Sequence, residues 1–224
     1  MVEYDRYKAS CLRAYNGRFG ARYDSALEVR IFRPVQMDDW VAGVLGPGIA
    51  KRSILDVACG TGRLLERLAR VGAVSLAGAD LAAGVLGVAR KRLRDQHVEA
   101  DLQVADAETV LPWATDSFDV VTMTGALHHF LHPEATLGEI RRVLRSSGTL
   151  IIVDVCFRTP IREFMNLCMR VRPHRGDCHF WEPRQAMDLL HANAWQVNSW
   201  RRIGWWSFAV VAVPMCDGGG GMRS

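Results

Sequence analysis

The chain lacks the features of a membrane or secreted protein. No apolar run reaches the roughly 18 residues that a bilayer span requires, and the first residues, MVEYDR, lack the apolar stretch of a signal peptide. The six cysteines are scattered over 224 residues without a C-x-x-C pair, so we expect reduced thiols rather than a disulfide framework. These absences predict a cytoplasmic protein without a membrane span.

The chain also lacks a large excess of charge of one sign. The net charge is +4, and the basic residues are dispersed along the chain. The two denser groups, RKRLR at 90–94 and Arg141, Arg142 and Arg145, contain no aromatic residue that could stack on a base. We interpret both groups as solvated helix faces and expect no nucleic-acid partner. Nothing in the pattern indicates the oligomeric state.

Ordinary globular composition is present, with 49% hydrophobic and 23% charged residues, enough for one core. From Ser53 onward, short apolar runs alternate with helical periodicity, which is typical of a parallel sheet covered by helices. The pattern predicts a Rossmann-like α/β fold with a seven-stranded, mostly parallel sheet, an antiparallel final strand and helices on both faces. The strands are expected at 54–58, 75–80, 101–106, 118–124, 149–155, 195–204 and 206–213.

The same periodicity predicts how the chain is divided. Residues 1–50 form an N-terminal helical extension or cover, and residues 51–215 form one domain. Within that domain, 157–193 interrupts the strand–helix rhythm and is a candidate lid, with one short helix near 161–168 and another from Pro183 to Asn193. The tail at 216–224 contains four consecutive glycines and is expected to be disordered.

Helical spacing identifies the apolar faces of two further helices. A helix is predicted to begin at Pro133 and Glu134. Proline suits the first turn of a helix, and glutamate there interacts favourably with the helix dipole. Its expected apolar face is Leu137, Ile140 and Leu144. The expected face of the helix before residue 50 is Met37, Trp40, Val41 and Val44.

The strongest local signal is LDVACGTG at 55–62, where a strand runs into a glycine turn and then a helix. Gly60 and Gly62 allow a ligand to approach the backbone, and the helix start offers free N–H groups. A nicotinamide or flavin site needs a third glycine, but Leu65 or Arg63 stands there, depending on the register. A G-x-x-x-x-G-K-[ST] phosphate loop is also missing. The loop therefore indicates a nucleoside without a pyrophosphate.

An acidic residue follows at the expected end of the second strand. Asp80 lies twenty residues after Gly60, where a carboxylate can accept both hydrogen bonds of a ribose diol. This position suits NAD and S-adenosylmethionine (SAM) equally. The alternative is a solvated aspartate at a strand end.

The motifs LDVACGTG, Asp80, DAE at 106–108, LPW at 111–113 and FDVV at 118–121 occur in the order that resembles class I SAM-dependent methyltransferases. ALHHF at 126–130, EIRRVL at 139–144 and GTL at 148–150 are similar to the small-molecule branch that includes ubiquinone and menaquinone C-methyltransferases. The resemblance covers about 53–155 and the final hairpin. It implies SAM as cofactor and methyl transfer as the activity.

The resemblance also implies cofactor contacts for a set of residues near the strand ends: Asp56, Ala58, Gly60, Gly62, Asp80, Leu81, Asp106, Ala107, Thr124 and Gly125. Asp80 would hold the ribose hydroxyls and Asp106 would accept the adenine amino group. Ala58 departs from the glycine of many relatives. The segment ARYD at 21–24 resembles one that covers SAM in relatives.

Two adjacent histidines follow the fourth expected strand. His128 and His129 are candidate catalytic residues, either as a general base or as groups that position the substrate, because imidazole titrates near neutrality. The alternative is a structural turn. We expect no metal, because His132, His174 and His179 lack ligand spacing.

The acceptor is expected to be a small molecule. RNA and protein methyltransferases carry an Asn/Asp-Pro-Pro-Tyr/Phe tetrapeptide after the fourth strand, where this chain has TGAL at 124–127. The aromatic residues of the C-terminal third favour an apolar or aromatic acceptor. Two alternatives stay open: a SAM-fold protein with a non-methylating or regulatory role, and a nicotinamide oxidoreductase.

Overall fold

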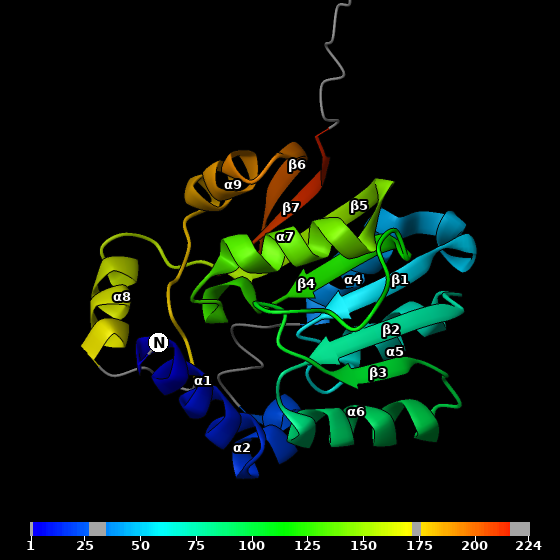
Figure 1. Cartoon of the computed structure of the whole chain (residues 1–224), viewed down its shortest axis with the longest axis horizontal. Coiled ribbons are helices and arrows are strands. Elements are labelled where there is room, and N and C mark those ends of the chain that lie inside the picture. The colour runs from blue at the N-terminus through cyan, green and yellow to red at the C-terminus, as the bar shows by residue number, and fades with distance from the viewer. Residues whose placement is uncertain (1, 27–34, 172–175, 216–224) are drawn as a thin grey trace, which may run out of the picture.

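The computed structural model describes residues 2–26, 35–171 and 176–215. Seven strands form one sheet in the order β3-β2-β1-β4-β5-β7-β6 (Figure 1). The strands are β1 (Ser53–Val57), β2 (Ser75–Asp80), β3 (Asp101–Val104), β4 (Phe118–Thr124), β5 (Leu144–Val155), β6 (Trp195–Ile203) and β7 (Ser207–Pro214). β1 to β5 pair in parallel, whereas β7 is antiparallel to both β5 and β6. The predicted fold class is confirmed.

Helices and short turns connect the strands. The α-helices are α1 (Val2–Tyr15), α2 (Arg18–Ala21), α4 (Val35–Leu45), α5 (Arg63–Arg70), α6 (Ala83–Asp95), α7 (Pro133–Val143), α8 (Ile161–Val171) and α9 (Pro183–Ala192). The 3-10 turns are η1 (Tyr23–Ser25), η2 (Gly46–Lys51) and η3 (Leu127–His129). Among the described residues, no helix combines the length and apolar character that crossing a bilayer requires.

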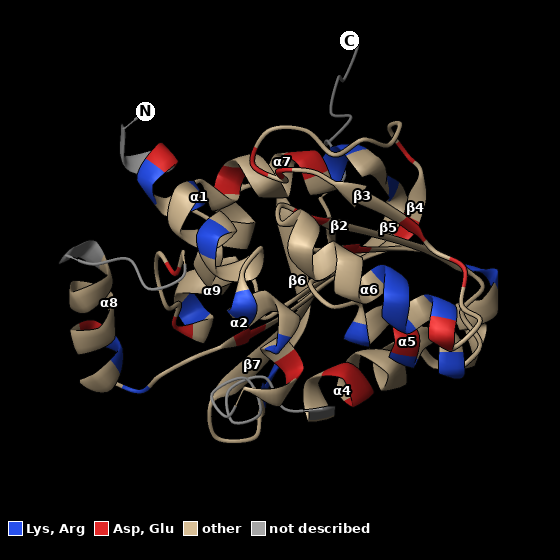
Figure 2. Cartoon of the chain, turned by 90° about the horizontal axis from the view of Figure 1, so that it is seen from below, with Lys and Arg blue, Asp and Glu red and all other residues tan. Residues whose placement is uncertain are grey.

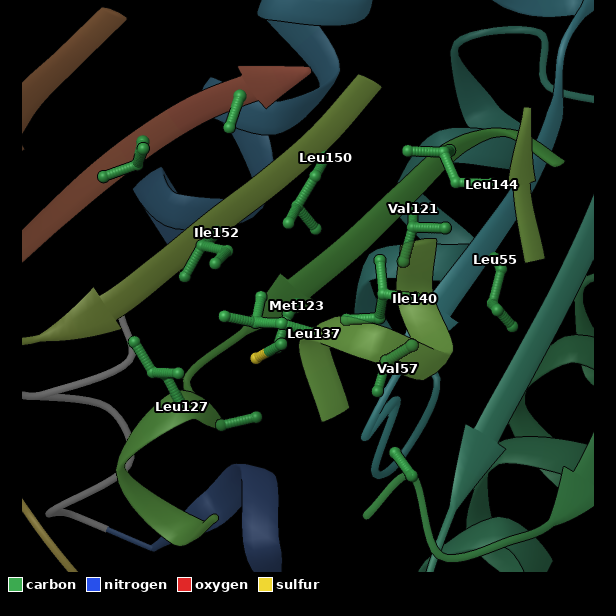
Figure 3. Close-up of a cluster of buried hydrophobic side chains, with 14 of the residues drawn as sticks. Leu55, Val57, Val121, Met123, Leu127, Leu137, Ile140, Leu144, Leu150 and Ile152 are labelled. Atoms are coloured by element: carbon green, nitrogen blue, oxygen red, sulfur yellow. The ribbon is translucent and has the colours of Figure 1, made fainter. Parts of the chain in front are cut away.

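One face of the sheet packs against α7 and α9. The register sets Leu55 beside Val121 and Val121 beside Leu150, so side chains from β1, β4 and β5 line up on this face. Leu137 and Ile140 of α7 cover them, and Figure 3 shows the resulting cluster. Because both faces of these central strands are buried, their sequences are almost continuously apolar.

The other face packs against α4, α5 and α6. Met37 and Val41 of α4 are fully buried there, as the spacing predicted. The prediction for Val44 was wrong: this side chain is 41% exposed, and Leu45 is buried in its place. The apolar stripe of α4 therefore turns away from Val44 at the last turn of the helix.

The boundary between α7 and β5 also differs from the prediction. Leu144 was expected on the helix, but α7 ends at Val143 and Leu144 begins β5. Leu144 pairs with Phe118 and is almost fully buried. Leu144 would reach the core either as the last residue of the helix or as the first residue of β5. In β5, its backbone hydrogen bonds come from pairing with β4 instead of from the helix.

The interrupting segment contains the two predicted helices. α9 begins at Pro183 and is capped at Asn193, and Glu182 and Gln185 form a capping box at its start. In α8, Ile161 and Phe164 are 50% and 66% exposed, so this helix turns apolar side chains to solvent. The predicted tail at 216–224 lies outside the described residues.

Charged residues of both signs lie on the outer helices (Figure 2). Arg63 and Arg67 of α5 pair with Asp38 and Asp39 of α4, at N–O distances of 2.5 and 2.6 Å. The Arg63–Asp38 pair is largely buried between the two helices, whereas the Arg67–Asp39 pair is exposed.

Candidate functional site

The site lies where the strand order reverses, between β1 and β4. Connections from these two strands leave the sheet toward opposite sides, and this arrangement opens a crevice at the carboxyl ends of the strands. A cavity that is partly open to solvent occupies this place. Figure 1 shows the arrowheads of β1, β2 and β4 directed toward the side on which α1 lies.

The cavity brings together most of the residues predicted from the sequence. Its lining includes Ala58, Gly60, Asp80, Leu81, Asp106, Ala107, Thr124, Gly125 and His129. Asp56, Gly62 and His128 stand outside the lining. Each of these three supports a residue or element next to the cavity.

The glycine loop between β1 and α5 needs left-handed backbone. Gly60 has a φ of 54° and Gly62 a φ of 72°, and Ala58 takes a φ of 55° despite its Cβ. A Cβ on Gly62 would lie 3.0 Å from the Cβ of Ala89 in α6. Gly60 thus lets the backbone face the cavity, whereas Gly62 lets the start of α5 pack closely on α6.

Asp80, at the end of β2, holds this loop in place. The Gly60 N–H donates to Asp80 Oδ2 at 2.9 Å, and the Ala82 N–H donates to Asp80 Oδ1 at 2.9 Å. A carboxylate has about four acceptor positions, so Asp80 retains capacity for the hydroxyls of a ligand. The side chain faces the cavity while its backbone partners lie at the loop.

Asp56 lies beneath the loop in the core and is almost fully buried. Its Oδ1 accepts a hydrogen bond from the Thr122 hydroxyl at 2.7 Å. Since Asp56 Cα is paired with Thr122 in the register, the bond ties β1 to β4 just before the cavity. Asp56 therefore stabilises the strand end from which the glycine loop departs.

Asp106 follows β3 and lies next to a lysine that sequence reasoning missed. Lys8 Nζ of α1 is 2.9 Å from Asp106 Oδ1 and also forms an ion pair with Glu108. Burial would lower the pKa of Lys8, but hydrogen bonds and charge from Glu108 and Asp106 outweigh burial and raise that pKa above its ordinary value. The lysine therefore fastens α1 over the β3 end of the cavity.

α1 roofs the cavity with three more residues absent from the sequence-based set. Tyr7, Cys11 and Tyr15 recur at intervals of four and line the cavity from one helix face. Burial, followed by the charge of Asp80, raises the pKa of Cys11 to about 12. Burial also raises the pKa of Tyr15 well above 10. The four-residue spacing near the N-terminus was the signal that could have identified this face.

The ARYD segment approaches the glycine loop as well. Asp24 in η1 accepts a hydrogen bond from the Thr61 hydroxyl at 3.0 Å and pairs with Arg92 of α6 at 2.5 Å. The neighbouring Tyr23 lines the cavity. η1 is thereby attached both to the loop and to α6.

The two histidines have different surroundings. His128 is buried, and its Nδ1 lies 2.7 Å from Asp154 Oδ1 at the end of β5. Burial would lower the pKa of His128, but the Asp154 carboxylate outweighs burial and raises it. His129 lines the cavity, with Nε2 3.3 Å from the Tyr15 hydroxyl. Burial and the neighbouring His128 lower the pKa of His129 to about 4.

Two carboxylates around the histidines were missed. Asp154 is fully buried. The available signal in the sequence was an acidic residue within the apolar run TLIIVDV. Asp177 lies near both rings, with Oδ1 3.1 Å from His129 Nδ1 and 3.8 Å from His128 Nε2. No local pattern distinguishes Asp177, because its position depends on the path of the chain after α8.

Comparisons with known proteins agree with this geometry. Residues 55–152 match the family described as "Methyltransferase domain". The chain is 36% identical over 126 residues to a ubiquinone biosynthesis O-methyltransferase of an Azoarcus species, covering 56% of this chain and 51% of that protein. It is 42% identical over 113 residues to a demethylmenaquinone methyltransferase of Clavibacter sepedonicus, covering 50% and 44%. The chain thus spans about half the length of these curated relatives.

A solved structure is similar over more of the chain. The magnesium protoporphyrin IX methyltransferase of Synechocystis, with bound S-adenosylhomocysteine (SAH), has a TM-score of 0.70 and 16% identity. The similarity covers 93% of this chain and 99% of that one. At this identity the likeness concerns the fold.

Proposed function

We propose that this chain, whose residues 55–152 match a methyltransferase domain, is a class I SAM-dependent methyltransferase that transfers a methyl group from SAM to a small, apolar or aromatic molecule. One observation carries the proposal. The cavity at the switch point of the sheet has a carboxylate, Asp80, aimed into it and held by the backbone of the glycine loop. This is the arrangement that a ribose diol requires.

The charge of the cavity fits the cofactor. Among the described lining residues, the side chains of Lys8, Asp80 and Asp106 are charged at neutral pH, which leaves an excess of one negative charge. SAM bears a positive sulfonium, so a negative lining attracts it.

We assign roles by position within the cavity. Asp80 accepts hydrogen bonds from the ribose, and Asp106 accepts one from the adenine amino group, with Leu81 and Ala107 against the ring. The backbone at Ala58 and Gly60 contacts the amino acid portion. Thr124 and Gly125 lie beneath the reacting centre. Asp56 and Gly62 act indirectly, because they hold the strand end and the helix start in place.

Bound SAM would supply an activated methyl group for transfer to a nucleophilic O, N or C atom of the acceptor. The protein then has to orient the acceptor and exclude water. α1, which covers the cavity with Tyr7 and Tyr15, performs the second task. His129 lies on the lining and performs the first, either by positioning the acceptor or by taking its proton. His128 lies outside the cavity lining and acts indirectly, by supporting the position of His129.

The proposal extends to the surroundings of the site. Residues 2–26 act as the cover, and α8 completes that cover as a lid. The described cysteines are free thiols, which fits a cytoplasmic location.

Ligand-dependent thermal stability tests the cofactor assignment. SAH at 100 times its dissociation constant should stabilise the folded protein by about 2.7 kcal/mol, measured as a higher melting temperature. NADPH serves as the control for the nicotinamide alternative and should give no shift. A folded protein that responds to NADPH and not to millimolar SAH would overturn the proposal.

Methyl transfer itself is tested with SAM labelled in the methyl group and a panel of phenols, quinols, amines and thiols. Label should move to an apolar or aromatic acceptor. The variant His129→Ala should lose turnover while keeping the SAH-induced shift in melting temperature. His132→Ala, at an exposed histidine outside the cavity lining, is the matched control and should retain both. SAH binding without transfer to any member of the panel would favour the non-methylating alternative.

A further inference from the structure

We propose that His128, His129 and Asp177 form a binding site for one divalent transition-metal ion, of the zinc type, next to the cavity. The three side chains offer imidazole Nε2, imidazole Nδ1 and a carboxylate oxygen, and these atoms all lie within 4.8 Å of one another. Two imidazoles and one carboxylate with an open fourth position are a ligand set that zinc uses in catalytic sites. The sequence had suggested no metal, because His132, His174 and His179 lack ligand spacing.

The distances fit a site that closes slightly around an ion. Asp177 Oδ1 is 3.1 Å from His129 Nδ1 and 3.8 Å from His128 Nε2. Ligand atoms held about 2.0–2.1 Å from one ion at tetrahedral angles are separated by roughly 3.3–3.5 Å. The two distances bracket that value, so small rotations of side chains suffice.

A buried nitrogen of His129 points to a ligand. His129 Nδ1 is shielded from solvent, and the carboxylate oxygen Asp177 Oδ1 lies 3.1 Å from it. A buried polar atom is unfavourable unless it has a partner. An ion between them would bind this nitrogen and the carboxylate oxygen together.

The outer partners orient both rings for this role. Asp154 Oδ1 holds His128 Nδ1 at 2.7 Å, so Nε2 is left facing Asp177. The Tyr15 hydroxyl lies 3.3 Å from His129 Nε2, which leaves Nδ1 for the ion. A carboxylate or other group on the far nitrogen of each histidine is the usual support of a metal ligand. Asp154 and Asp177 also bring two negative charges to the buried histidine pair, which favours a cation.

The ion would decide between the two roles left open for His129, and this step rests on the proposed function. With Nδ1 bound to the ion, the neutral ring carries its proton on Nε2. His129 then donates a hydrogen bond at the cavity, where the Tyr15 hydroxyl now lies. It would hold an acceptor oxygen rather than remove its proton.

The test uses the full chain without an affinity tag, from which EDTA has removed any metal. This protein is titrated first with cobalt(II) and then with zinc. Visible absorption of cobalt should report one equivalent per chain, which zinc displaces. Asp177→Asn removes the charge at nearly constant size, and His129→Ala removes the second ligand; each should abolish that equivalent. His132→Ala interrupts an exposed His–Glu pair with a 3.5 Å N–O distance and should leave it intact.

Melting temperature and SAH binding are measured for every variant, so a metal result is interpreted only for folded protein. No bound equivalent in the starting protein, or an equivalent that survives in both Asp177→Asn and His129→Ala, would overturn the site. A strong sulfur-to-cobalt absorption band would also overturn it, because the cysteines would then be the ligands. If SAH still binds when no metal does, the metal site has failed while the proposed function stands.

Discussion

The backbone N–H of Gly60 donates a hydrogen bond of 2.9 Å to Oδ2 of Asp80, so the turn after β1 is attached to the end of β2. One carboxylate therefore shapes the glycine loop and faces the cavity beside it. Any change at Asp80 acts on the ligand and on the loop together, and the choice of substitution has to separate the two effects.

Asp80→Asn is expected to weaken SAH binding by roughly 1.5–3 kcal/mol, because a neutral amide replaces the charged acceptor for the ribose while its size and one acceptor oxygen remain. Calorimetry measures the affinity, and melting temperature checks the fold. Asp95→Asn, at an exposed ion pair on α6, should leave the affinity unchanged. If Asp80→Asn binds SAH as tightly as the unaltered protein, the Asp80 charge does not hold the ribose and the side chain serves only the glycine loop.

The contacts of α1 predict how the cover moves. Lys8 fastens α1 to Asp106, and the Tyr7 hydroxyl donates to the Met169 carbonyl of α8 at 3.3 Å, so both helices form one cover. In the free protein, amides of α1 and α8 should exchange faster than those of β5, and SAH should slow them. Hydrogen exchange with mass spectrometry measures this.

Lys8→Met tests whether the ion pair holds the cover. The variant should speed exchange in α1 of the free protein and leave β5 unchanged, because β5 contains no partner of Lys8. Equal protection of α1 and β5 without ligand would show that α1 is a permanent part of the fold.

Glu139 predicts a pH dependence of stability. Its hydrogen bond with Arg142, together with the N–H of Leu111, lowers the pKa of Glu139 in the folded protein. The stabilisation is therefore present above the unfolded pKa, about 4.3, and is lost as the pH falls through the lower folded value. Glu139→Gln should destabilise the protein by about 1 kcal/mol at pH 7, since the pair is partly exposed to solvent.

The measurement is chemical denaturation of both proteins from pH 7 to pH 3. The difference in unfolding free energy should shrink as the pH falls below 4.3, and the exposed Glu163→Gln should show little difference at any pH. A difference that stays constant over this range would mean that the charge of Glu139 contributes nothing.

Cys11 predicts slow chemical modification. Burial raises the pKa of this thiol to about 12, so the reactive thiolate is scarce at pH 8. Alkylation by iodoacetamide, followed by mass spectrometry, should proceed far more slowly at Cys11 in the folded protein than in urea. SAH should slow it further, because Cys11 lines the cavity. Rapid labelling of folded protein would contradict the position of α1.

Local pattern was sufficient for the framework of this protein. Alternation of apolar runs with helical spacing identified all seven strands, because burial on one or both faces imposes that pattern residue by residue. The turn at Gly60 and the acid at Asp80 were evident for a similar reason. Each stands at a strand end, and parallel strands bring their carboxyl ends to one edge.

Tertiary structure alone decided what surrounds that edge. Lys8 meets Asp106 and Asp177 meets His129 across long stretches of chain, and no periodicity records which distant loop will arrive beside which strand. Val44 and Leu144 departed from prediction for a related reason. Helical spacing marks an apolar face, but contacts with neighbouring elements determine where that face turns outward and where the helix gives way to a strand.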